Sequence, residues 1–175
     1  MTVVIRPRVE EDIQALADVL VRVHAQDGYP VEGVADPVAW LCSDRMLSSW
    51  VAELDGEVVG QVMLAEPGDG DAATKIEEQR SGLSGEEISV LGRLFVDPSA
   101  RGKRIAGNLI NAAVDYSEAV GRIPVLDVMA KDRAAIALYE RMGWEKIGTF
   151  EHVFRGGSVP ALAYRYATGK RPRGW

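Results

Sequence analysis

Apolar residues recur along this chain at two spacings, every second residue and every third or fourth residue. Alternation over Trp50–Leu54 and Val58–Leu64, joined by Asp55-Gly56, predicts a tight β-hairpin, because Asp-Gly favours the turn that matches strand twist. Helical spacing over Glu10–Ala25 predicts an amphipathic helix that follows a first strand at Val3–Arg6. The chain therefore opens with a strand, a helix and a hairpin.

The same spacings predict the remaining elements. Further strands are expected at 88–96, 124–129, 144–150 and 160–166, and helices at 36–41 (capped by Asp36), 101–120 and 132–142. Residues 66–86 are polar, with a short helix expected near Ala72–Arg80. The strand–helix–strand order between 88 and 129 predicts one parallel pair in a mostly antiparallel sheet. The predicted class is α/β, in the sense of an α+β mixed sheet with helices on both faces.

Size and charge exclude several classes of protein. A chain of 175 residues fits one domain over 1–168 and a basic tail over 169–175, and a net charge of −6 argues against nucleic-acid binding. No apolar run approaches the about 18 residues of a membrane helix, and the N-terminus does not resemble a signal peptide. A single Cys42 and two His predict no disulfide framework and no metal site, and we expect a cytoplasmic protein.

Residues 94–107, Leu-Phe-Val-Asp-Pro-Ser-Ala-Arg-Gly-Lys-Arg-Ile-Ala-Gly, carry the clearest candidate chemistry. An apolar strand stops at Asp97-Pro98, and a short basic loop then leads into a helix. Unpartnered N–H groups at a helix N-terminus attract phosphate, and Arg101, Lys103 and Arg104 add positive charge. The alternative is an ordinary strand–turn–helix joint with solvated basic residues.

A second segment, 131–144, reads Lys-Asp-Arg-Ala-Ala-Ile-Ala-Leu-Tyr-Glu-Arg-Met-Gly-Trp. Asp132 suits the N-cap of a helix whose small Ala134 and Ala135 leave room for a ligand or for close packing. Taken alone, Tyr139 in such a helix is more often a core residue than a catalyst.

Together these segments resemble the GNAT superfamily of N-acetyltransferases over roughly residues 3–166. Members carry Arg/Gln-x-x-Gly-x-Gly/Ala where this chain has Arg101 to Ala106, and an Asn, an Ala and a Tyr where it has Asp132, Ala135 and Tyr139. The resemblance implies a GNAT-type fold with a splayed parallel strand pair. It also implies direct transfer of an acetyl group from acetyl-CoA to an amine, without a metal, by a protein that often forms a homodimer.

The resemblance also implies roles for individual residues. The strand backbone at Leu94, Phe95 and Val96 would bind the pantetheine arm and stabilise the oxyanion, and Tyr139 would protonate the leaving thiolate. The loop residues expected at the pyrophosphate are Arg101, Gly102, Lys103, Arg104, Ile105, Ala106 and Gly107. Asp132 completes the expected cofactor site, although an anion there is a poor donor to a ligand carbonyl.

Two departures from the family pattern carry expectations of their own. Arg104 stands where the pattern has its first Gly, and we expect it to keep helical dihedrals and the loop to keep its function. Val90 stands where one branch of the family has a Glu base, so Glu86, Glu87, His24 or no base at all remain candidates. For His24, a histidine hydrogen-bonded near the surface is the more common role.

The acceptor side is expected in segments 24–31, 66–86 and 150–160, with Asp27, Tyr29, Trp40 and Trp50 as candidate lining. For each of these four, a turn or core role is the competing interpretation. Two other functions are considered. One is a non-catalytic acyl-CoA-binding module of the same fold. The other is a dinucleotide-binding domain, but this chain lacks the Gly-x-Gly-x-x-Gly signature of such domains. The amine itself is not indicated by the sequence.

Overall fold

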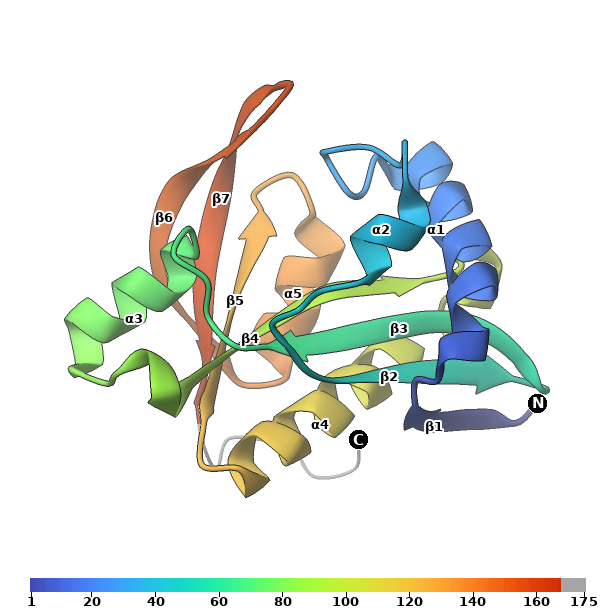
Figure 1. The fold of residues 1–175 in the computed structure, drawn as a ribbon, viewed down its shortest axis with the longest axis horizontal. Coiled ribbons are helices and arrows are strands. Elements are labelled where there is room, and N and C mark those ends of the chain that lie inside the picture. The colour runs from blue at the N-terminus through green and yellow to red at the C-terminus, as the bar shows by residue number, and fades with distance from the viewer. Residues whose placement is uncertain (168–175) are drawn as a thin grey trace. The chain divides into compact units, whose positions relative to one another are not determined.

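The computed structural model describes residues 1–167 and contains seven strands, five α-helices and three short 3-10 turns within that range (Figure 1). In chain order these are β1 (Val3–Pro7), η1 (Glu10–Asp12), α1 (Ile13–Asp27), α2 (Pro37–Leu41), β2 (Met46–Leu54), β3 (Glu57–Ala65), α3 (Ala72–Ser81), η2 (Gly85–Glu87), β4 (Ile88–Val96), η3 (Pro98–Ala100), α4 (Ile105–Ala119), β5 (Ile123–Met129), α5 (Arg133–Arg141), β6 (Trp144–Phe154) and β7 (Gly157–Tyr166). The basic tail expected at 169–175 lies outside the described residues.

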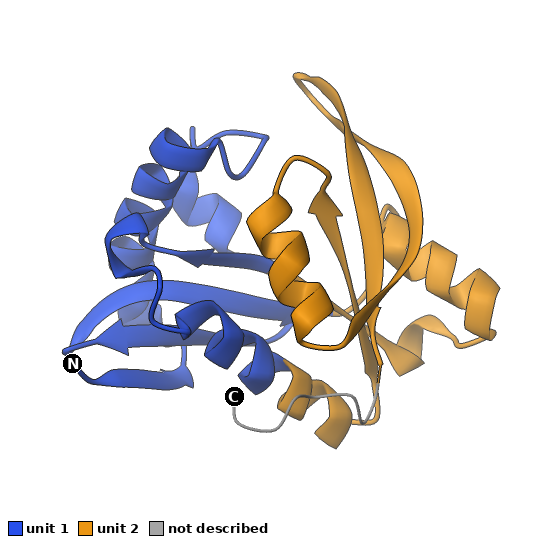
Figure 2. Cartoon of the chain, turned by 180° about the vertical axis from the view of Figure 1, so that it is seen from behind, with its two compact units in different colours: residues 1–65, 93–113 blue, residues 66–92, 114–175 orange. Residues whose placement is uncertain are grey.

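The chain divides into two compact units (Figure 2). Unit 1 comprises residues 1–65 and 93–113, and unit 2 comprises residues 66–92 and 114–175. Strand β4 and helix α4 each contribute residues to both units. The single domain expected over residues 1–168 stays a prediction.

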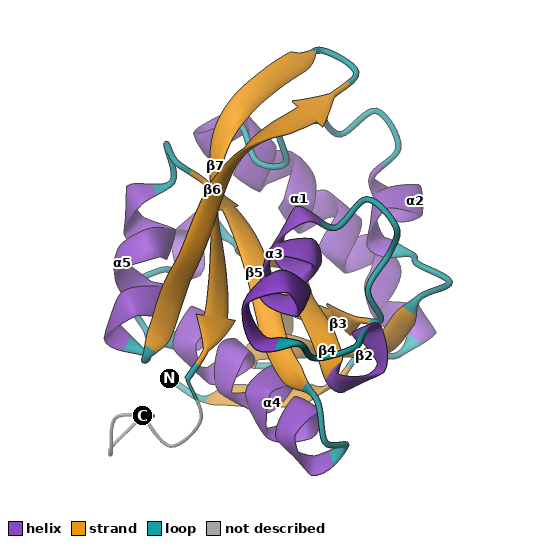
Figure 3. Cartoon of the chain, turned by 90° about the vertical axis from the view of Figure 1, so that its left-hand side faces the viewer, coloured by secondary structure: helices purple, strands orange, loops and turns teal. Residues whose placement is uncertain are grey.

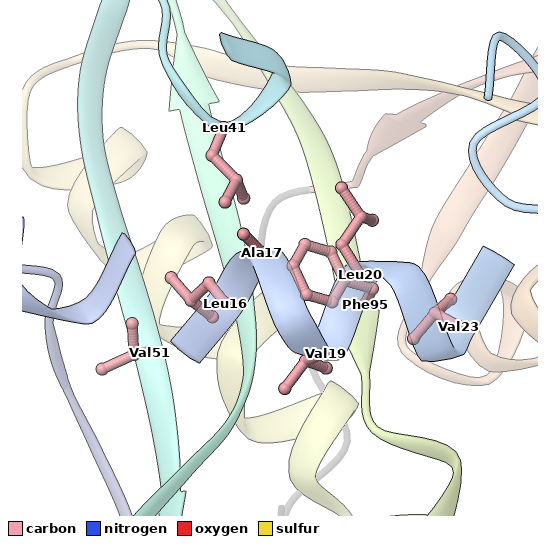
Figure 4. Packing of buried hydrophobic residues seen from close by; sticks show 8 residues of the cluster. All are labelled: Leu16, Ala17, Val19, Leu20, Val23, Leu41, Val51 and Phe95. Carbon is pink, nitrogen blue, oxygen red and sulfur yellow. The ribbon is translucent and has the colours of Figure 1, made fainter. Parts of the chain in front are cut away.

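Unit 1 is built on an antiparallel meander in which β2 pairs with both β1 and β3. The predicted hairpin turn is confirmed: Asp55 and Gly56 lie between the strands with φ of 52° and 86°, as a two-residue turn with two left-handed positions requires. Helix α1 packs its apolar face against this sheet, and Leu16, Leu20 and Leu41 are fully buried there (Figure 4). Each buried leucine contributes about 2 kcal/mol, and this core holds α1 and α2 in place.

Unit 2 contains the parallel pair that the sequence predicts. Residues Ile88–Val90 of β4 pair in parallel with Ile123–Val125 of β5, and β7 pairs antiparallel with both β5 and β6. Neighbouring residues of β7 point to opposite faces: Ala163 belongs to the apolar cluster beneath α3, whereas the Tyr164 hydroxyl donates to Glu140 of α5 over 2.7 Å. Helices α3 and α5 therefore cover opposite faces of this part of the sheet (Figure 3).

The strand order is β1-β2-β3-β4-β5-β7-β6 in one seven-stranded mixed sheet, which confirms the predicted fold class. The predicted short helix near Ala72–Arg80 is also confirmed as α3. Some boundaries were wrong. The strands expected at 144–150 and 160–166 extend to Phe154 and begin at Gly157. The helix expected to begin at Arg101 begins at Ile105, because Arg104 has a φ of 60° and cannot be helical. Residues 101–104 instead form an extended turn that leads into α4.

Candidate active site

The strand before the candidate phosphate loop departs from regular β-structure at Arg93, whose φ is 51°. A left-handed residue inside a strand is typical of a β-bulge and shifts the alternation of the residues that follow it. The carbonyl of Arg93 accepts a hydrogen bond from Gln61 Nε2 over 3.1 Å, and Gln61 is fully buried. The irregularity is therefore fixed by a buried side chain of the neighbouring strand.

Beyond the bulge, β4 approaches β3 closely at Gly60. A Cβ on Gly60 would lie 2.6 Å from the Phe95 carbonyl oxygen and 3.2 Å from Val96 Cα. The Asp97 N–H donates to the Val59 carbonyl over 2.7 Å. Only glycine permits this approach, so Gly60 sets the position of the backbone at Phe95 and Val96.

Asp97 ends β4 and joins it to α1. Its carboxylate accepts from the Ser99 N–H at 3.0 Å, from the Ser99 hydroxyl at 2.8 Å and from Arg22 of α1 at 2.6 Å. Burial alone would raise the pKa of Asp97, but the hydrogen bonds from Arg22 and Ser99 outweigh it and lower the pKa below its ordinary value. The carboxylate is thus held ionised at the entrance to the loop.

The loop itself contains two left-handed residues, Gly102 with a φ of 79° and Arg104 with a φ of 60°. Helical dihedrals were expected for Arg104, but the structure gives it a left-handed conformation, which a glycine adopts at no steric cost. Left-handed turns that lead into a helix direct successive N–H groups to one side. The first-turn N–H groups of Ile105 to Gly107 have no intrahelical partner and lie at the positive end of α4.

The basic side chains of the loop differ in what they contact. Arg101 pairs with Asp27 at the end of α1, so Asp27 serves the loop as well as being a candidate for the acceptor side. The pair is partly exposed, and its contribution to stability is about 1 kcal/mol or less. Lys103 is half-buried and Arg104 is exposed.

Tyr139 lies in unit 2, on α5. Its side chain is 6% exposed and packs edge-on against Trp144, with ring centroids 5.7 Å apart. Burial first, and then the charges of Asp127 and Asp132, raises the pKa of Tyr139 well above its ordinary value. The phenol is therefore a weaker acid than the sequence alone suggests.

Asp132 occupies the N-cap position of α5, but its carboxylate makes no capping hydrogen bond to the helix and pairs with Lys131 at 3.3 Å instead. The predicted N-cap position of Asp132 is therefore confirmed, but the capping hydrogen bond expected from its side chain is not made. Its carbonyl still accepts from the Ile136 N–H, so the helix starts here through the backbone.

The candidate bases differ in their surroundings. His24 Nδ1 is buried and has no hydrogen-bond partner among residues 1–167, so this nitrogen does not have the hydrogen-bonded surface role. Glu86 and Glu87 are exposed on η2, where Glu87 accepts from the Ser84 hydroxyl at 3.3 Å.

Two candidate acceptor residues of unit 1, Tyr29 and Trp40, form an aromatic row with Phe95. Tyr29 meets Trp40 edge-on at 5.8 Å, and both rings are partly buried, whereas Phe95, 6.1 Å from Trp40, and Trp50 are buried core residues. The sequence interpretation missed Arg93, which stacks over Trp40 at 5.5 Å. A lone cation after a glycine in an otherwise apolar strand was the available signal.

By unit, the expected site residues fall into two groups. Unit 1 contains Leu94, Phe95, Val96, the loop 101–107 and segment 24–31. Unit 2 contains Asp132, Tyr139 and segments 66–86 and 150–160. Between residues 1 and 167, no three His, Cys, Asp or Glu side chains are arranged to hold a metal ion. No helix in that same range is both long and apolar enough to cross a membrane.

Comparison with known proteins agrees with this geometry. The family model described as acetyltransferase (GNAT) family matches residues 14–144. The "uncharacterized N-acetyltransferase YjgM" of Escherichia coli is 31% identical over 147 residues, with 78% of each chain covered. The "uncharacterized N-acetyltransferase MJ1207" of Methanocaldococcus jannaschii is 32% identical over 108 residues, which are 61% of this chain but only 43% of that protein.

The fold is also found among solved structures. Arabidopsis thaliana NAA60, crystallised in complex with acetyl-CoA, superposes with a TM-score of 0.67 at 22% identity, over 94% of this chain and 98% of that one. At this level of identity the likeness concerns the fold alone. Because the family model spans most of the chain, the protein belongs to the acetyltransferase (GNAT) family.

Proposed function

We propose that this protein transfers an acetyl group from acetyl-CoA to a primary amine. The observation that carries the proposal is the loop at 101–104, where Gly102 and Arg104 are both left-handed and lead into the N-terminus of α4. Such a turn presents backbone donors to a diphosphate without needing a particular side chain. The fit agrees with family membership and with the acetyl-CoA found in the related plant structure.

The backbone after the bulge supplies the second part of the proposed site. We expect the N–H and C=O groups of Leu94 and Val96, which follow the bulge at Arg93, to bind an extended pantetheine arm as an additional strand. Gly60 of β3 sets the position of the Phe95 and Val96 backbone. An N–H group at Val96 would then stabilise the oxyanion that forms on the thioester carbonyl.

In the proposed reaction a neutral amine attacks the thioester carbonyl and gives a tetrahedral intermediate. As the intermediate collapses, the C–S bond breaks, the new C–N bond remains, and the ammonium proton is lost to solvent or to a base. The thiolate takes a proton from Tyr139 or from water. Because the pKa of Tyr139 is raised, positioning of the sulfur contributes more than acidity.

Calorimetry with acetyl-CoA and a thiol-release assay with a panel of amines test this function separately. We expect saturable binding of acetyl-CoA and thiol release that depends on an amine. Asp27→Asn should leave Arg101 available to the phosphates and tighten binding slightly, whereas Arg101→Gln should weaken it. Binding without amine-dependent release would indicate the non-catalytic acyl-CoA-binding module, and no binding at millimolar concentration would refute the proposal.

A further inference from the structure

The partly buried arginines of this protein are of two kinds. Arg6 pairs with Asp12 and Glu53, Arg122 with Glu66, and Arg165 with Glu77. Arg8 and Arg93 are also half-buried, but within residues 1–167 neither is within ion-pair distance of a carboxylate. Because a buried charge is costly without a partner, these two positions call for an explanation.

The contacts of Arg93 leave much of its hydrogen-bonding capacity unused. Its Nη1 donates to the Cys42 carbonyl at 3.4 Å and contacts the Met63 sulfur at 3.2 Å, and its guanidinium lies over the Trp40 ring. Among described residues, Nε and Nη2 have no acceptor. A guanidinium with one free edge matches the two oxygens of a carboxylate.

Neighbouring positive charges favour the binding of an anion near Arg93. Arg45 and Arg8 lie within electrostatic range of Arg93, and Arg8 is itself fixed by the Leu41 carbonyl at 2.9 Å and by Gln61 Oε1 at 2.8 Å. On the acidic side, Glu32 is within electrostatic range of Arg93 and is exposed, and Asp12 is within range of Arg8 but is already paired with Arg6. Burial above all, together with these like charges, lowers the pKa of Arg93 and Arg8. The arginine cluster, defined as Arg8, Arg45 and Arg93, thus has an excess of positive charge.

The arginine cluster lies close to the proposed acetyl site. Arg93 immediately precedes Leu94–Val96 in β4, and at about 3.3 Å per residue its Cα is about 10 Å from Val96. The same side chain borders the aromatic row of Tyr29, Trp40 and Phe95. An acceptor held here would have an anionic group on Arg93 and an apolar group on the partly exposed rings of Tyr29 and Trp40.

We propose that the arginine cluster binds the carboxylate of the acyl acceptor, so that the substrates are aminocarboxylates, such as α-amino acids with an apolar side chain. This inference rests on the proposed acetyltransferase function. Arg93 provides the paired hydrogen bonds, Arg45 adds charge at the exposed edge, and Arg8 with Gln61 holds the bulge in position. A purely structural role for Arg93 over Trp40 would give no preference for acceptors with a carboxylate.

Matched acceptors test the proposal. Thiol release is measured with phenylalanine, phenylalaninamide and 2-phenylethylamine, which share the ring and differ at the carboxylate. We expect kcat/KM to be at least tenfold higher for phenylalanine. In Arg93→Gln this value should fall about 10- to 100-fold, mainly through KM, whereas 2-phenylethylamine should change less than about threefold.

Further variants separate binding from folding. Arg45 is exposed, so Arg45→Gln keeps the fold and should lower kcat/KM for phenylalanine alone, by about two- to fivefold. Arg141→Gln, at an exposed position on α5, is the matched control and should change nothing. Acetyl-CoA affinity, measured by calorimetry, should be the same in all variants.

The outcomes distinguish the two proposals. Two results overturn the aminocarboxylate assignment and leave the acetyltransferase function intact. The first is acetylation of amines with no preference for acceptors that carry a carboxylate. The second is an equal decrease in kcat/KM for all three acceptors in Arg93→Gln, with no change in Arg45→Gln. Acetylation confined to amines without a carboxylate overturns it as well. A wild-type protein that does not bind acetyl-CoA overturns both.

Discussion

Gly60→Ala tests whether close packing of β3 on β4 positions the proposed acetyl site. The new Cβ would lie 2.6 Å from the Phe95 carbonyl oxygen, and ordinary contact begins at 3.4 Å, so the two strands must separate by about 0.8 Å. The obstacle is backbone, and the Asp97–Val59 and Gln61–Arg93 hydrogen bonds on either side resist separation. Overpacking of this kind costs about 1–3 kcal/mol.

For a chain of this length that cost corresponds to a decrease in Tm of about 2–12 °C. Affinity for acetyl-CoA should fall as well, because the backbone of Phe95 and Val96 is displaced. Gly92→Ala is the control, since its Cβ would meet nothing within 4 Å and its φ is not positive. The reasoning is refuted if Gly60→Ala has the Tm and the acetyl-CoA affinity of the wild type. It is also refuted if Gly92→Ala lowers the Tm and the affinity as much as Gly60→Ala does.

Three further predictions concern single side chains. Tyr139→Phe should lower kcat and leave the calorimetric Kd for acetyl-CoA nearly unchanged; equal turnover would remove the phenol from the mechanism. Arg104→Val should be less stable than Arg104→Gly by about 1–2 kcal/mol and have a lower Tm, because a side chain at a φ of 60° is strained. Equal Tm values would contradict the left-handed turn. The pKa of Asp12 is lowered mainly by Arg6, so the ionised carboxylate stabilises the fold above the ordinary pKa of an aspartate, and this stabilisation is lost as the pH falls below it. The difference in free energy of urea unfolding between wild type and Asp12→Asn should therefore be larger at pH 6 than at pH 3. A difference that does not change with pH would argue against the ion pair.

Most of the element order could be predicted because it depends on local signals. The hairpin at Asp55-Gly56 follows from turn chemistry that two adjacent residues determine. The parallel pair follows from the helix between 88–96 and 124–129, which leaves few other topologies. In these cases the physical cause lies within a few residues of its effect.

The departures arise where distant residues determine the local backbone. Nothing in an arginine indicates a left-handed conformation, yet both Arg93 and Arg104 adopt one. At Arg93 the determinants are Gln61 on β3 and the close approach at Gly60, more than thirty residues away in the chain. The arginine cluster was missed for the same reason, since its members come from three separate parts of the sequence.

The buried phenol of Tyr139 limits what a pH–rate profile of the proposed reaction can mean. A free tyrosine titrates near pH 10, and burial beside Asp127 and Asp132 moves this one higher. An inflection observed between about pH 6 and 9 therefore reports on the incoming amine or on a base, and the profile becomes a direct way to identify which group loses its proton before attack.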